Sequence, residues 1–171
     1  MDYQKYSMNP NKHFPYKYLY YTSWSFLPTL LVAFDHKIYD LSIITFLVGF
    51  VSLNFWREPS YSWRREMDLY IAQLGVDYYF VRSFDSSVGY IFCILFLVTL
   101  YRFKLSLIYY NDKKYGLAVI NHGAMHIGTN MSIIYLLQSG ITSYPLFIDR
   151  YIFSLLLFIS FIQYNIISKL V

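Results

Sequence analysis

The stretch SVGYIFCILFLVTLY, residues 87–101, runs through fifteen positions without a charged side chain. Such a run provides most of a membrane-spanning helix, because about 20 helical residues cross a hydrocarbon core of about 30 Å. The whole chain shares this character, with 57% apolar and only 14% charged residues among 171. Soluble domains contain about 25% charged residues. The composition therefore predicts a multi-pass integral membrane protein.

Five further apolar segments lie on either side of this run, separated by charged or turn-forming residues. Several are shorter than 20 residues, and the Tyr, Trp, Lys and Arg residues near their ends can extend their reach. Pro28 predicts a kink in the first segment. We expect an all-α, polytopic bundle of about six transmembrane helices, with a polar inner segment at residues 1–17 and a single domain at residues 18–171. The six predicted spans are residues 18–34, 38–56, 67–81, 87–101, 117–137 and 151–168.

Basic residues divide unequally between the two sides of the membrane if all six segments span. With the N-terminus inside, the inner side holds 11 of the 14 Lys and Arg residues and the outer side holds 3. If the segment 67–81 does not span, the division becomes 8 to 6. The positive-inside rule favours six spans with both termini on the inner side. Lipid headgroups then account for the basic pI of about 9.0, and no nucleic-acid partner is needed.

The sequence excludes several kinds of cofactor and covalent site, because the motifs that they need are absent. The lone Cys93 rules out an intramolecular disulfide, and the chain has neither a Gly-rich nucleotide loop nor a Gly-x-Ser-x-Gly motif. A haem with two His ligands needs them on opposite sides of the iron. His122 and His126 lie one turn apart on one predicted helix, and the other two histidines lie in terminal or loop segments. We therefore expect no haem and no nucleotide cofactor.

Four polar side chains in the predicted spans are candidates for a site, because they lie within two to three turns of the inner surface: Ser52, Asp68, His122 and His126. Polar groups at this depth are costly, so each needs a partner or a function. The two histidines are four residues apart and share a helix face, which suits two ligands of one metal ion. The same spacing equally suits hydrogen bonds to neighbouring helices.

Asp68 has a second interpretation of its own. It lies in the first turn of its predicted helix, where a carboxylate is favoured and can pair with Arg64 or Arg65. Gln73 and Asp77 lie deeper in the same helix, and we expect them to pair inside the bundle instead of facing lipid.

The order Ser52, Asp68 and His122-x-x-x-His126 resembles the CREST superfamily of membrane metal hydrolases, which includes the alkaline ceramidases and the progestin and adipoQ receptors. Trp56 stands where that family carries its first metal-binding His. The resemblance implies a zinc ion held by His122, His126 and Asp68, with Ser52 supporting a bound water.

Two functions follow from these observations. The first is a zinc-dependent, CREST-like hydrolase of a lipid amide or ester at the inner face, with Asp68 as general base and Ser52 beside it. The alternative is a non-catalytic structural or accessory subunit that packs in a larger membrane complex, such as one of an organelle. Membrane lipids are expected partners in both cases, and other membrane subunits are expected partners in the second.

Overall fold

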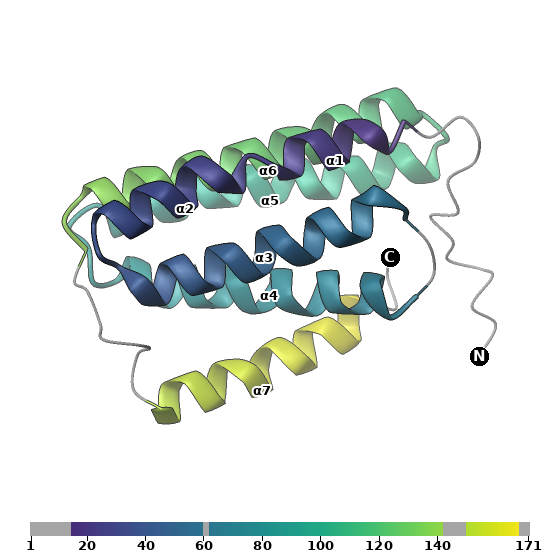
Figure 1. The fold of residues 1–171 in the computed structure, drawn as a ribbon. Helices are drawn as coiled ribbons and strands as arrows, with labels where there is room; N and C mark the ends of the chain where they lie inside the picture. The colour runs from purple at the N-terminus through teal and green to yellow at the C-terminus, as the bar shows by residue number, and fades with distance from the viewer. Residues whose placement is uncertain (1–14, 60–61, 142–149, 168–171) are drawn as a thin grey trace.

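The computed structural model describes residues 15–59, 62–141 and 150–167, and every regular element in these residues is an α-helix (Figure 1). The all-helical prediction is therefore confirmed for this part of the chain. Residues 1–14 of the predicted polar segment and residue 168 of the sixth predicted span lie outside it. The helices are α1 (Lys17–Ser23), α2 (Phe26–Asp35), α3 (Tyr39–Arg57), α4 (Trp63–Ser83), α5 (Gly89–Asn111), α6 (Tyr115–Gln138) and α7 (Arg150–Ile167).

Successive helices alternate in direction, apart from α1 and α2, which follow one line (Figure 1). The α1–α2 pair packs on α3 and α6, α5 packs along α6, α4 packs on α3, and α7 packs on α4. Two ends result. We call the end that carries Lys17, Arg57, Arg64, Lys113 and Lys114 the basic end. The opposite end contains the α2–α3 and α4–α5 connections.

The first predicted span is divided into two helices by a turn at Trp24 and Ser25. Pro28 predicted a kink in this segment, and the break lies three to four residues before it. The reason is that Pro28 lacks the N–H that would bond to the carbonyl of residue 24, four positions earlier. Pro28 itself lies in the first turn of α2, where that missing donor is tolerated.

The fourth predicted span ends too early. It was expected to stop at Tyr101, whereas α5 continues to Asn111. Arg102 and Lys104 do not interrupt it, because both side chains lie on its exposed face and the Arg102 guanidinium donates to Asn121 Oδ1 on α6 at 3.2 Å. Long basic side chains of this kind can follow an apolar surface to reach the headgroup level.

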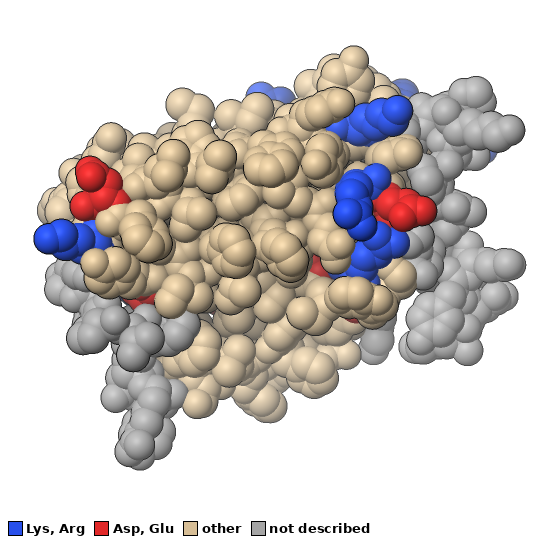
Figure 2. Space-filling model, in the orientation of Figure 1, with Lys and Arg blue, Asp and Glu red and all other residues tan. Residues whose placement is uncertain are grey.

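Large apolar side chains cover the outside of the bundle, including Leu31, Phe50, Leu97, Met131 and Phe158, all more than half exposed. Figure 2 shows most charged residues of the visible face near its two ends, with a mainly uncharged surface between them. By length and composition, α3 and α5 could each cross a membrane, and α7 contains a shorter apolar stretch at Ile152–Ile166.

Candidate functional site

Ser52 and Asp68 face each other across the α3–α4 interface, near the basic end. The Ser52 hydroxyl donates to Asp68 Oδ1 at 2.5 Å, and Asp68 is buried. The antiparallel packing of α3 on α4 explains this contact, because it brings the last turns of α3 beside the first turns of α4. Arg64 pairs with Glu58 and Arg65 with Glu66, and the charge of Arg65 also acts on Asp68.

The two histidines touch each other on α6. Their ring centroids are 4.9 Å apart, with the ring planes at 89°. His122 Nδ1 lies 3.3 Å from Ser106 Oγ on α5. The ring of His122 also meets Trp56 and Phe103 edge to face, at centroid distances of 5.1 and 5.5 Å. His122 is therefore enclosed by aromatic rings and one hydroxyl.

His126 points to the broken first span. Its Nδ1 lies 3.1 Å from Thr22 Oγ1 and 3.4 Å from Ser23 Oγ. One turn further along α6, Asn130 accepts from Thr29 Oγ1 at 2.9 Å. The α6 polar stripe therefore makes the contacts to neighbouring helices that the hydrogen-bonding interpretation of the two histidines expects.

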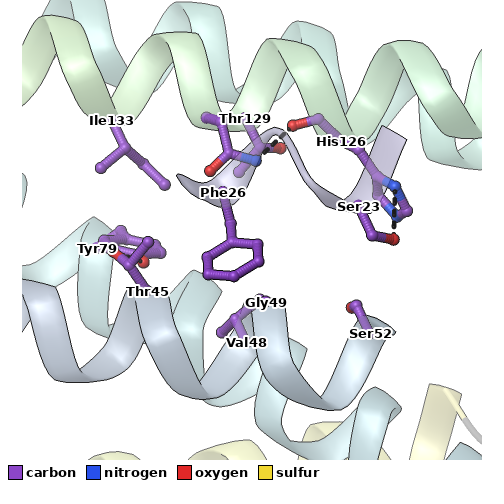
Figure 3. A pocket seen from close by; sticks show the side chains of 11 residues that line it. Ser23, Phe26, Thr45, Val48, Gly49, Ser52, Tyr79, His126, Thr129 and Ile133 are labelled. Carbon is purple, nitrogen blue, oxygen red and sulfur yellow. Dashed lines mark hydrogen bonds between the residues drawn. The ribbon is translucent and has the colours of Figure 1, made fainter. Parts of the chain in front are cut away.

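A cavity of about 60 Å³ lies between α1–α2, α3, α4 and α6 (Figure 3). Ser52 and His126 both line it, whereas Asp68 and His122 are not among its lining residues. Figure 3 shows Phe26 extending into this region above Gly49 and Val48. Trp56 lies beside the site, 2% exposed against His122, and its Nε1 has no hydrogen-bond partner among the described residues.

A zinc site with three protein ligands does not fit this arrangement as it stands. Within residues 15–59, 62–141 and 150–167, no group of three His, Cys, Asp or Glu side chains is placed to hold one metal ion. His122 and His126 contact each other, Asp68 bonds to Ser52, and Trp56 packs against His122. No family model, curated protein or solved structure matches the chain. The CREST resemblance and the zinc ligands thus stay predictions.

One buried charged cluster was missed from the sequence. Arg82 Nε donates to Asp40 Oδ2 at 2.7 Å, and both side chains are fully buried. Tyr78 donates to the same oxygen at 2.9 Å, and Arg82 also pairs with Asp85. Asp40 lies near the start of the second predicted span, and Arg82 directly follows the third. Their positions at the facing ends of consecutive antiparallel spans were the signal that could have paired them.

The expectation for Gln73 and Asp77 is confirmed. The amide of Gln73 donates to Asp77 Oδ1 at 3.2 Å, and Ser160 of α7 donates to Asp77 Oδ2 at 2.6 Å. These contacts lie at the interface between α4 and α7, so the carboxylate helps to attach α7 to the bundle.

Proposed function

We propose that this chain is a multi-pass integral membrane protein with six spans, in which α1 and α2 form one broken span. The observation that supports it is the apolar outer surface between two charged ends (Figure 2). In water, an exposed apolar surface of this extent would drive association. The 19 residues of α3 and 23 residues of α5 reach about 28 and 34 Å, which suits a hydrocarbon core of about 30 Å.

The charged residues of α4 are compatible with a span because their partners lie inside the bundle. Asp68 bonds to Ser52, Asp77 to Ser160, and Arg82 to Asp40. Polar residues in membrane helices characteristically face other helices and pair there. Six of the described basic residues lie at the basic end, which the positive-inside rule would assign to the inner face. Those residues are Lys17, Arg57, Arg64, Arg65, Lys113 and Lys114, whereas Arg102 and Lys104 lie 9 and 7 residues before the end of α5.

Within this bundle we propose a hydrolase-like site for a lipid amide or ester at the cavity near the inner face. What supports it is that Ser52 and His126 line one internal space and that Asp68, bonded to Ser52, is in place to take a proton from the Ser52 hydroxyl. A bilayer substrate can enter such a site sideways. The zinc ion predicted by the resemblance is not needed for these contacts.

Hydrolysis is tested on the purified full-length chain in lipid micelles, by measuring fatty acid released from a panel of lipid amides and esters. We expect Asp68→Asn and Ser52→Ala to lower the rate by about 100-fold or more, because they remove the proton acceptor and its partner. Ser42→Ala is the matched control. Ser42 is a buried serine of the same helix whose hydroxyl bonds to the Ile38 carbonyl, away from the cavity.

Metal analysis of the same preparations tests the zinc prediction separately. Near-stoichiometric zinc that is lost in His122→Ala and Asp68→Asn would support it, and wild-type protein without metal would refute it. If the wild type releases no fatty acid from any substrate, the hydrolase proposal is wrong, and the accessory-subunit function becomes the better account.

A further inference from the structure

The hydrogen-bonding character of the cavity between α1–α2, α3, α4 and α6 depends on which groups accept the protons of its polar side chains. A hydroxyl has one proton, and a side-chain amide has two. Once these protons are donated to protein groups, a side chain can offer a guest only its lone pairs. The polar residues that line the cavity can be followed one at a time in this way (Figure 3).

The hydroxyls at the two ends of Figure 3 have used their protons. Ser23 donates to the Leu19 carbonyl at 2.8 Å. Thr45 donates to the Leu41 carbonyl at 2.7 Å. Tyr79 lies 2.8 Å from Thr45 Oγ1, and since the Thr45 proton is committed, Tyr79 must be the donor of that bond.

Two further hydroxyls are committed in the same way. Ser52 donates to Asp68 Oδ1 at 2.5 Å. Thr129 donates to Thr99 Oγ1 at 3.3 Å, and Thr99 in turn donates to the Phe96 carbonyl. Neither Ser52 nor Thr129 has a proton left for the cavity.

Asn130 and the ring of His126 complete the lining. The Asn130 amide donates to Ser25 Oγ at 3.0 Å and to the His126 carbonyl at 2.8 Å, which uses both protons. Thr22 and Ser23 both donate to the Leu19 carbonyl, so each can only accept from His126. His126 Nδ1 therefore carries the ring proton, and Nε2 keeps its lone pair.

The remaining lining, Phe26, Val48, Gly49 and Ile133, supplies no side-chain donor. The cavity thus presents hydrogen-bond acceptors and aromatic rings but no free donor. Its volume of about 60 Å³ is several times the roughly 10–15 Å³ needed by one water. A ligand that binds here must therefore supply the hydrogen-bond donors.

We propose that this cavity binds a small primary ammonium group. Three N–H donors match the hydrogen-bond acceptors of the lining, the Asp68 carboxylate that accepts from Ser52 provides the opposite charge, and the aromatic rings of Phe26 and Tyr79 line the same space. This inference concerns the same cavity as the proposed function, and it restricts the ligands of that cavity to molecules with a primary amine. It does not depend on hydrolysis.

The test is a titration of the full-length chain in lipid nanodiscs with methylammonium chloride, followed by the ¹⁵N resonances of His126. The resonances are assigned with a His126→Gln variant. We expect Nδ1 to be the protonated nitrogen before addition, and a saturable shift of Nε2 as methylammonium binds. Asp68→Asn should weaken binding by about tenfold or more, since a charged partner is lost, whereas Ser42→Ala should leave it unchanged.

Sodium chloride at equal concentration tests charge alone, and acetonitrile tests a neutral guest of similar size without a donor. If either shifts His126 as strongly as methylammonium, or if methylammonium gives no saturable shift, the proposal is overturned. Fatty acid release is measured separately. Binding without hydrolysis refutes only the proposed function, and hydrolysis without binding refutes only this inference.

Discussion

At the residue scale, Gly49 sets how closely α2 approaches α3. A Cβ at Gly49 would lie 2.2 Å from Cγ of Phe26, so the ring packs directly on the glycine. Gly49→Ala must displace Phe26, and we expect it to lower the free energy of unfolding by about 1–3 kcal/mol. Thermal unfolding followed by a thiol-reactive dye measures this, because the chain has one cysteine, the half-buried Cys93.

Gly116→Ala is the control for that substitution. Gly116 also lies in a helix, but a Cβ there would meet no atom within 4 Å. We expect this variant to unfold at the wild-type temperature or slightly above it, since alanine is favoured over glycine in helices. Equal unfolding temperatures for the two variants would show that the Phe26 contact is unimportant.

At the scale of elements, the Asp40–Arg82 pair joins the start of α3 to the end of α4. Asp40→Leu or Arg82→Met alone removes one half of a fully buried ion pair, and we expect each to cost about 3–5 kcal/mol. The double variant should lose much less than the sum, because an apolar pair of similar size removes both charges. Asp85, the other partner of Arg82, is part exposed and can be hydrated. Additive losses in the same dye assay would contradict the coupling.

At the scale of the whole molecule, a bundle of six spans determines which loops between helices lie on the same side of the membrane. In a Cys93→Ser background, single cysteines at His36, Ser87 and Asn111 occupy exposed positions at three helix connections. We expect a membrane-impermeant maleimide, applied from one side of sealed vesicles, to label His36→Cys and Ser87→Cys together and Asn111→Cys only from the other side. Labelling of Ser87→Cys from the side opposite to His36→Cys would show that α4 does not span.

Much of the fold follows from local sequence, and the candidate site follows only in part. The apolar segments and their punctuation predicted helices that the structure contains, because helix formation depends on neighbouring residues and their burial. The predicted end of the fourth span at Tyr101 was too early, because the charge of Arg102 does not end the helix. The Arg102 side chain donates to Asn121 on α6. Ser52 and Asp68 could be proposed as neighbours because they lie near the facing ends of consecutive helices.

The charge-poor run at residues 87–101 and its five counterparts determined an all-helical chain, since their composition alone decides which segments avoid water. Only the tertiary structure decided which way each helix turns its polar face. His126 meets Thr22 and His122 meets Trp56 because packing fixes the rotation of α6 against α1 and α3. That rotation depends on contacts between residues far apart in the chain, and for that reason the acceptor-lined cavity could not be foreseen from residue spacing.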